Sequence, residues 1–525
     1  MDRREFLKGL SAGAVAFLGA PCISLAGGKD DRPNIVLIMA DDMGYSDIGC
    51  YGGEVRTPNL DKLAYGGMRF TQFYNCAKCG PTRATLLTGQ HYQTVGMKRM
   101  QYGATFAEVL RPAGYRTLAC GKWHQKPLPT TRGFDRYYGL ADGCCNYFNP
   151  GMEAREDEPR PGRKSKNRGP RRWAIEDKEI MGYTNPDKDF YTTDAFTDYA
   201  VDRLEEYKGE DKPFVLYLAY TAPHYPLHAW PKDIAKYRCK YRDGWDKLRQ
   251  SRYKRQLEMG LIKAETAPLS KRDESVKAWE SLSEEQKDAE DLKMAVYAAM
   301  IERMDVGIGK VVEKLKELGK FENTLILFLS DNGGCAGSPN PTPEIAPGPV
   351  ESYRAVGRSW ANASNTPYRK YKRSDYHGGN CTPFIAHWPA VIKAGQLTDQ
   401  VAHIIDILPT FMELAGASYP DEIDGRKIKS VAGKSLLPIF EGRQRKPHEV
   451  LCWQYKDAAA IRRGDWKLVK WNDSGWELYD LSSDRTETKN LADKYPEKTE
   501  QMKRTWQKWI KSTAAGLPER LQTKF

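Results

Sequence analysis

The sequence predicts an α/β protein, with a large, mostly parallel mixed sheet between helices and a smaller C-terminal α+β domain on a short antiparallel sheet. Three long apolar runs predict strands of the large sheet, at residues 34–40, 214–220 and 324–330. Each run is continuously apolar rather than alternating, which is typical of parallel strands covered on both faces. Helical patterns lie between the runs, as a parallel sheet requires.

Composition limits the classes of protein that fit. The chain has 525 residues, 40% of them apolar and 29% charged, which allows a large core and a second, smaller domain. The formal net charge of +12 favours anionic partners. No nucleic-acid-binding module is recognisable, and no run beyond the N-terminus reaches the about 18 apolar residues of a membrane span. We therefore expect no nucleic-acid partner and no stable membrane insertion.

Residues 1–26 predict a bacterial twin-arginine (Tat) signal peptide. Arg3 and Arg4 precede a small, weakly apolar stretch at residues 9–21, and residues 24–26 (Ser-Leu-Ala) offer a small-residue cleavage site. We expect the mature protein to be periplasmic or secreted.

The clearest helix is predicted at about residues 291–318, where Met294, Ile301 and Leu315 lie on one apolar stripe. Gly319 follows as a C-cap. The polar segment at residues 238–290 predicts a surface excursion that includes a helix-compatible stretch.

Residues 153–172 are rich in charge, proline and glycine, which predicts a loop insertion. Such a run is most often merely solvated. The sharper hypothesis is that its basic side chains bind a polyanionic substrate.

The pattern changes after about residue 445. Four short runs separated by turn residues predict an antiparallel sheet, at residues 449–454, 458–462, 466–470 and 477–480. A last helix carries Met502, Trp506, Trp509 and Ile510 on one face. We therefore predict a main domain at residues 33–445 and a C-terminal α+β subdomain at residues 446–525.

Polar side chains follow four predicted strands, at the point where each strand ends. The groups are Asp41-Asp42, Asp331-Asn332, the Lys122 to His124 segment after a shorter strand at residues 115–120, and His224. Open α/β sheets bind ligands beyond the carboxyl ends of their strands, so we expect one composite site.

Asp41, Asp42, Asp331 and Asn332 offer only carboxylate and amide oxygens. Such a set selects a hard cation, Ca²⁺ or alternatively Mg²⁺, over Zn²⁺. Taken singly, each pair also fits a turn or a helix N-cap.

The segment Cys79-Gly80-Pro81-Thr82-Arg83, continued by Ala84-Thr85-Leu86-Leu87-Thr88-Gly89, resembles the signature of type I sulfatases. The stretches at residues 41–49, 371–379 and 383–389 also resemble that family. The resemblance runs from about Pro33 to the final helix and implies an alkaline phosphatase-like fold. Taken alone, Cys79 also fits a buried structural cysteine or a Cys-x-x-Cys pair with Cys76.

The resemblance implies that Cys79 is converted to Cα-formylglycine, by a formylglycine-generating enzyme or a radical maturase. It implies a metal site made by Asp41, Asp42, modified Cys79, Asp331 and Asn332. The hydrated aldehyde would then act as the nucleophile that attacks sulfur.

The resemblance also implies roles for five further residues. Arg83 and Lys122 would hold the formylglycine hydroxyls, and His124 would deprotonate the second hydroxyl so that sulfate is expelled. His224 and Lys372 would contact the sulfate and assist the leaving group. The sequence departs from the family at Thr82, where Ser is commoner, and at His377, where Glu is usual.

The leading interpretation is an exported sulfatase that hydrolyses sulfate monoesters of carbohydrates or aryl alcohols. One alternative is a formylglycine-dependent phosphodiesterase or phosphonate monoester hydrolase. Another is a polyanion-binding protein without catalytic activity, in which Cys79 stays unmodified. The complete set of acids, bases and metal-binding residues argues against the last.

Overall fold

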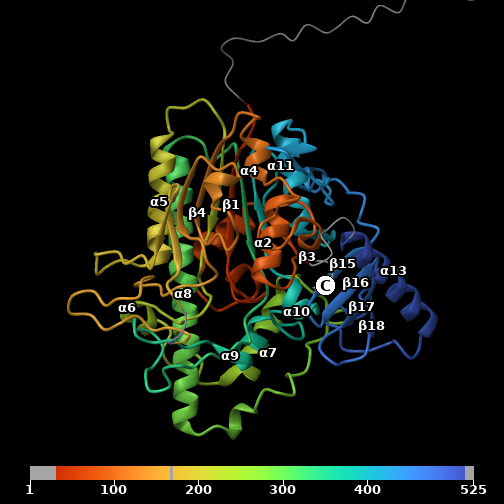
Figure 1. Cartoon of the computed structure of the whole chain (residues 1–525). Coiled ribbons are helices and arrows are strands. Elements are labelled where there is room, and N and C mark those ends of the chain that lie inside the picture. The colour runs from red at the N-terminus through yellow and green to blue at the C-terminus, as the bar shows by residue number, and fades with distance from the viewer. Residues whose placement is uncertain (1–30, 166–168, 515–525) are drawn as a thin grey trace, which may run out of the picture. The chain divides into compact units, whose positions relative to one another are not determined.

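The computed structural model describes residues 31–165 and 169–514, and its main element is a ten-stranded mixed sheet (Figure 1). In spatial order the strands are β11 (Gln396–Thr398), β2 (Met68–Phe70), β10 (Phe384–His387), β9 (Thr324–Ser330), β1 (Asn34–Ala40), β8 (Phe214–Ala219), β4 (Arg116–Gly121), β5 (Arg136–Leu140), β6 (Arg172–Ile175) and β7 (Lys178–Met181). The five central strands, β9 to β5, are parallel, and β10, β6 and β7 introduce antiparallel pairs. The predicted large, mostly parallel mixed sheet is confirmed.

Alternate residues of the central strands pack into two different cores. On β1, Val36 and Ile38 pack into one core together with Met294 of helix α8, while Leu37 faces the other core with Phe411 of α11. This two-sided burial explains why the strand sequences are continuously apolar. Figure 1 shows α5 and α8 on one side of the sheet and α2, α4 and α11 on the other.

The longer helices are α1 (Pro58–Tyr65), α2 (Cys79–Thr88), α5 (Thr192–Glu206), α7 (Gly244–Glu258), α8 (Glu284–Glu317), α9 (Gly357–Ser364), α11 (Ile407–Ala415) and α13 (Pro496–Ala514). The shorter helices are α3 (Tyr92–Val95), α4 (Phe106–Leu110), α6 (Pro231–Ala235), α10 (His377–Asn380) and α12 (Leu437–Phe440). Helix α8 begins earlier than predicted, because Ser283 and Gln286 form a capping box ahead of the apolar stripe. Helix α7 lies in the polar segment predicted to be a surface excursion.

The C-terminal strands form a separate four-stranded antiparallel sheet, as predicted. They are β15 (Leu451–Tyr455), β16 (Ala458–Arg463), β17 (Trp466–Lys470) and β18 (Glu477–Asp480). Met502 of α13 packs against this sheet with Ile461 and Leu468. The described residues from Arg32 onward form one compact unit, and the domain boundary near residue 445 stays a prediction.

The loop predicted at residues 153–172 carries no helix or strand before Arg172, at the positions where the structure describes it. No helix among the described residues is long and apolar enough to cross a membrane. The predicted signal peptide at residues 1–26 lies outside the described residues.

Gly121, at the end of β4, permits a close approach between β4 and β8. Its φ is +96°, and a Cβ atom there would lie 1.9 Å from the carbonyl oxygen of Ala219. The next residue, Lys122, donates its backbone N–H to that same oxygen at 2.7 Å. Gly121 therefore fixes where the polar segment after β4 leaves the sheet.

We predict that Gly121→Ala lowers the free energy of unfolding by about 3 kcal/mol or more, because the new Cβ clashes with backbone and the φ is unfavourable. Gly395→Ala is the matched control, since φ is +76° there but no atom lies within 4 Å of the added Cβ. The control should lose only about 1 kcal/mol. Urea unfolding measures both, and equal losses would contradict the steric argument.

Candidate functional site

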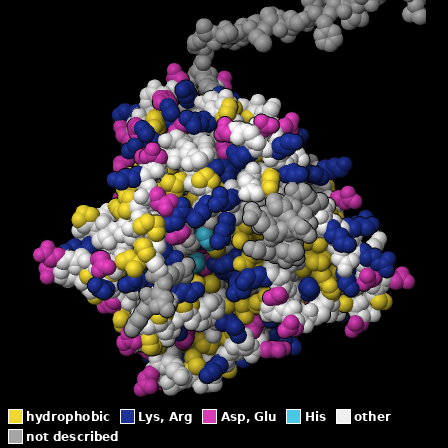
Figure 2. Space-filling model, in the orientation of Figure 1, with side chains coloured by type: hydrophobic (Ala, Val, Ile, Leu, Met, Phe, Trp, Pro, Cys, Tyr) yellow, Lys and Arg dark blue, Asp and Glu magenta, His cyan; other side chains and the backbone are white. Residues whose placement is uncertain are grey.

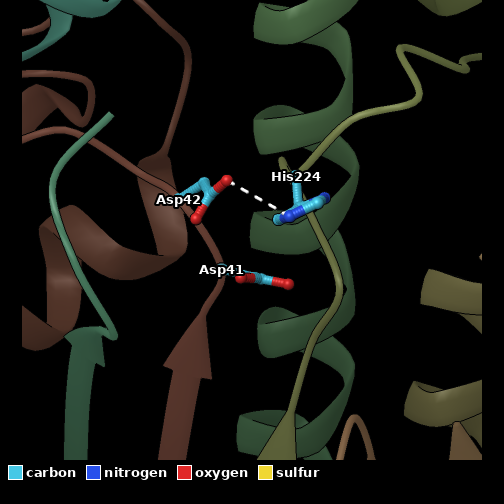
Figure 3. Close-up of side chains that lie close together, drawn as sticks. All are labelled: Asp41, Asp42 and His224. Carbon is cyan, nitrogen blue, oxygen red and sulfur yellow. Dashed lines mark ion pairs between the residues drawn. The ribbon is translucent and has the colours of Figure 1, made fainter. Parts of the chain in front are cut away.

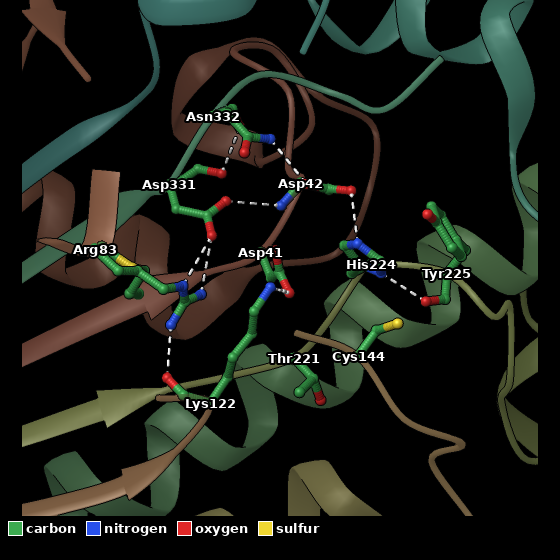
Figure 4. A network of polar contacts seen from close by, with 12 residues as sticks. Asp41, Asp42, Arg83, Lys122, Cys144, Thr221, His224, Tyr225, Asp331 and Asn332 are labelled. Carbon is green, nitrogen blue, oxygen red and sulfur yellow. Dashed lines mark hydrogen bonds and ion pairs between the residues drawn. The ribbon is translucent and has the colours of Figure 1, made fainter. Parts of the chain in front are cut away.

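The structure brings all ten sequence-predicted site residues together beyond the carboxyl ends of four adjacent parallel strands, β9, β1, β8 and β4. Nine of them are buried and His124 is half-buried. They are Asp41, Asp42, Cys79, Arg83, Lys122, His124, His224, Asp331, Asn332 and Lys372. Figure 4 shows most of this network.

Asp41 and Asp42 follow β1 directly. Asp42 has a φ of +66°, a left-handed conformation that is uncommon for a residue other than glycine. Figure 3 shows its carboxylate turned towards His224, whose Nε2 lies 3.4 Å from Asp42 Oδ2. Because of this backbone conformation, the side chains of the consecutive residues Asp41 and Asp42 can both face the site.

Asp331 and Asn332 follow β9. Asp331 Oδ2 accepts hydrogen bonds from Arg83 Nη2 at 2.9 Å and Nε at 3.1 Å, and its Oδ1 accepts the backbone N–H of Asp42 at 3.2 Å. Asn332 donates its side-chain amide to Asp42 Oδ1 at 2.8 Å (Figure 4). The ends of β1 and β9 are therefore joined by side chains of the site itself.

Three buried oxygens at the centre of this network have no hydrogen-bond partner: Asp41 Oδ1, Asp42 Oδ2 and Asn332 Oδ1. Buried polar atoms without a partner are costly and rare, and oxygens of this kind suit a hard cation. Ligand atoms of Asp41, Cys79 and Asp331 also lie within 4.8 Å of one another, as do those of Asp41, Asp42 and His224. The donor set therefore fits a divalent cation with mainly oxygen ligands.

The carboxylates differ in their tendency to ionise. Burial, followed by repulsion from Asp41, raises the pKa of Asp331 to about 7 despite the pairing with Arg83. Burial also raises the pKa of Asp41, although Lys122 opposes this effect. At Asp42, burial is outweighed by His224 and Lys372, and the pKa falls. At Asp41 and Asp331 burial thus outweighs the paired Lys122 and Arg83, and a bound cation would favour the ionised form of both carboxylates.

Cys79 is the first residue of helix α2, and Lys78 is its N-cap. Burial would raise the pKa of the thiol, but the positive charges of Lys122 and Lys372 outweigh burial and lower it well below its ordinary value. His124, which follows β4 with a φ of +62°, is an electrostatic neighbour of Cys79. Residue 79 therefore sits in an electropositive environment that suits a reactive side chain.

Two lysines bring fixed positive charge to the site. Lys122 Nζ lies 2.5 Å from Asp41 Oδ2, and Lys372 Nζ pairs with Asp42 Oδ1. Burial would lower the pKa of each ammonium, but the paired aspartates outweigh it and raise both values. Both lysines therefore stay charged at neutral pH.

His224 is held on the loop after β8 by two hydrogen bonds. Its Nδ1 lies 2.6 Å from the carbonyl oxygen of Tyr225, and Tyr147 donates its hydroxyl to the carbonyl oxygen of His224 at 2.8 Å. A carbonyl oxygen can only accept, so Nδ1 carries the proton and Nε2 presents a lone pair. Burial lowers the pKa of His224 to about 3, so the imidazole is neutral.

His377 is not part of the network formed by the ten site residues. Its ring lies between the Tyr74 hydroxyl, at 2.8 Å from Nε2, and the carbonyl oxygen of Arg485, at 2.7 Å from Nδ1. Its backbone N–H donates to Glu487 Oε2 at 2.8 Å, and Lys467 pairs with the other oxygen of Glu487 at 2.6 Å. Residues near the C-terminal four-stranded sheet therefore hold the segment that carries Lys372.

Sequence reasoning missed Tyr147 and Lys78. Tyr147 donates a hydrogen bond to the loop that carries His224, but nothing in the sequence distinguishes it among the 29 tyrosines. Lys78 adds positive charge near Asp42, and its position directly before Cys79 was a usable signal.

Comparisons with known proteins agree with this geometry. The sulfatase family profile matches residues 33–417, and the profile of the N-sulphoglucosamine sulphohydrolase C-terminal region matches residues 370–514. An arylsulfatase of Klebsiella aerogenes is 33% identical, over 82% of this chain and 97% of its own length. An uncharacterized sulfatase of Schizosaccharomyces pombe is 32% identical, over 91% of this chain and 93% of its own.

One solved structure is that of Ps i-CgsB in complex with k-i-k-neocarrahexaose. It is 28% identical to this chain and superimposes with a TM-score of 0.65, covering 91% of this chain and 92% of that one.

We predict that Ca²⁺ raises the melting temperature of chelator-treated protein more at about pH 8 than at about pH 5.5. Asp331, with a pKa of about 7, is protonated at the lower pH, so the cation must displace a proton. Because this pKa lies above the ordinary value, the contribution of Asp331 to metal-free stability falls as pH rises from about 4 towards 7. Calorimetry at matched ionic strength measures the increase in melting temperature that Ca²⁺ causes at each pH.

Two variants control this experiment. Asp331→Asn should lose most of the Ca²⁺ increment, and Asp473→Asn, at an exposed position, should keep it. Increments of equal size at the two pH values would contradict the prediction.

Proposed function

The chain belongs to the sulfatase family, whose members are sulfuric ester hydrolases, and from this premise we propose that it hydrolyses sulfate monoesters through a residue derived from Cys79. The observation that carries the proposal is the set of partnerless oxygens of Asp41, Asp42 and Asn332, beside Cys79 and among buried cations. Sulfated carbohydrates and aryl sulfates are the proposed substrates. Export through a Tat signal at residues 1–26 to the periplasm or medium belongs to the same proposal.

We propose that Asp41, Asp42, Asp331, Asn332 and residue 79 hold Ca²⁺, with Mg²⁺ as the alternative. The cation would supply Lewis acidity towards the reacting oxygens. Oxidation of Cys79 by a formylglycine-generating enzyme or radical maturase would supply a hydrated aldehyde as the nucleophile.

The remaining side chains stabilise charge. A sulfate ester carries negative charge on its sulfuryl oxygens, and this charge moves to the ester oxygen as the bond breaks. Lys122, Lys372 and Arg83 are buried and positively charged, so their charge can stabilise negative charge on these oxygens. Burial strengthens such interactions, because water does not screen them.

Proton transfer requires one base and one acid. Burial lowers the pKa of His124, so it is neutral at pH 7 and able to accept a proton from residue 79. Lys372 is an ammonium and can donate to the leaving oxygen. His224 lies 3.4 Å from Asp42 through Nε2, and we propose that it contacts the bound sulfate. Because Nε2 carries a lone pair in this state, it would donate a hydrogen bond to a sulfate oxygen only after it takes up a proton.

We predict that protein produced together with a formylglycine-generating enzyme carries an aldehyde at residue 79. Peptide mass spectrometry should show that residue lighter by the difference between CH₂SH and CHO. Cys79→Ala should lower kcat for an aryl sulfate by at least about 1,000-fold, because the nucleophile is lost.

Cys76→Ser is the matched control for Cys79→Ala. Cys76 is buried in the loop that precedes Cys79, and its thiol contacts Thr85 Oγ1 at 3.4 Å, a contact that a serine hydroxyl can also make. This variant should keep most of the activity. Full-speed sulfate release by protein with an intact Cys79 thiol, or faster turnover of an aryl phosphodiester, would overturn the proposal.

A further inference from the structure

A cavity of about 950 Å³ lies next to the site, and Lys372 forms part of its wall. A volume of this order is at the upper end of the range for sites that enclose drug-sized ligands. A sulfate group with a single aromatic ring would leave much of it empty. The cavity also shares Asp273, Glu274 and Lys370 with a neighbouring cavity of about 450 Å³.

The wall of the larger cavity carries unbalanced positive charge. Lys78, Lys164, Arg358 and Arg373 line it, and none of them forms an ion pair with an acid of the described chain. Figure 2 shows Lys and Arg side chains gathered around a hollow in which histidine is visible.

The acids of the wall do not neutralise these cations. Asp273 already pairs with Lys370 at 2.9 Å, so that pair adds no net charge. Glu274 is the other acid on this wall, and it is exposed. One negative charge therefore faces four positive charges, in addition to the cations that surround the reacting sulfate.

The position of Arg373 is fixed by its backbone conformation and by a backbone hydrogen bond. Its φ is +79°, and its N–H donates to the carbonyl oxygen of Ala77 at 2.7 Å, in the loop that leads to Cys79. The adjacent side chain, Lys372, reaches Asp42, while Arg373 is exposed and lines the cavity. A non-glycine residue held in the left-handed region is costly and is found most often where function needs it.

The same wall offers aromatic surfaces. Tyr225 and Trp471 line the cavity and are partly exposed, and Lys164 lies 5.9 Å from the centre of the Tyr225 ring. Flat aromatic surfaces beside cations suit a sugar ring that carries anionic substituents.

We propose that the substrate carries a second anionic group, besides the sulfate ester that is cleaved, and that Arg373, Arg358 and Lys164 bind this group. The proposal rests on the proposed sulfatase function and narrows its substrate class to glycans with at least two negative charges. The second group is a sulfate or a carboxylate, since both have oxygens that accept hydrogen bonds from guanidinium and ammonium groups.

The test uses three disaccharides that share one cleavable sulfate: one with no other charge, one with a second sulfate, and one with a uronic carboxylate. We expect kcat/KM for at least one doubly charged sugar to exceed that of the singly charged sugar by about tenfold or more. The sugar that gains most identifies the second group. Equal kcat/KM values for all three would overturn the proposal.

The double variant Arg358→Gln, Arg373→Gln should reduce this preference about tenfold, mainly through KM. Arg463→Gln is the matched control, because Arg463 is exposed, forms no ion pair within the described residues and lies outside this cavity wall. The control should leave the preference unchanged. A double variant that slows all three sugars equally would contradict the assignment.

Calorimetric binding of the same sugars to the Cys79→Ala protein separates the two proposals. If the unmutated, maturase-treated protein releases sulfate from no sugar but the doubly charged sugars still bind the variant about tenfold more tightly, the sulfatase proposal fails while the second anion site stands. If sulfate is released and all sugars bind equally, the second anion site fails alone.

Discussion

The site depends on one electrostatic constraint, the burial of three carboxylates and three permanent cations beyond the ends of four parallel strands. Asp41 pairs with Lys122, Asp42 with Lys372 and Asp331 with Arg83. Taking charges out of water is costly unless each has partners, so every one of these side chains restricts the position of another. The network formally balances without a metal, and a divalent cation would make it net positive. A net positive charge suits the binding of a sulfate ester, which is an anion.

Much of this arrangement could be predicted because it follows from periodicity and strand order. Continuous apolar runs identified β1, β8 and β9, and the polar residues directly after them identified the site. The sequence could not predict that β10 is antiparallel to β9, since a short apolar strand has the same pattern in either direction. It could not find Tyr147 either, because the role of that hydroxyl depends on a loop distant in sequence.

Backbone conformation adds a signal that residue type does not reveal. Asp42 and His124 are site residues with positive φ angles, and Ala77, Lys370 and Arg373, also with positive φ, lie within two positions of Cys79 or Lys372. Eight other described non-glycine residues have positive φ angles elsewhere in the chain. A left-handed conformation costs an L-residue about 1–2 kcal/mol. Glycine would avoid this cost but would carry no functional side chain. At Asp42 and His124, side-chain placement therefore takes precedence over local backbone preference.

The contact between Glu487 and the backbone of His377 has a consequence for how such chains can diverge. Glu487 and Lys467 belong to the C-terminal part of the chain, yet they hold a segment that enters the reaction centre from the other part. The terminal sheet is therefore not an interchangeable module. A chimera that exchanged this sheet with that of a relative would have to transfer the residues that contact it as well, so the two parts are expected to evolve together.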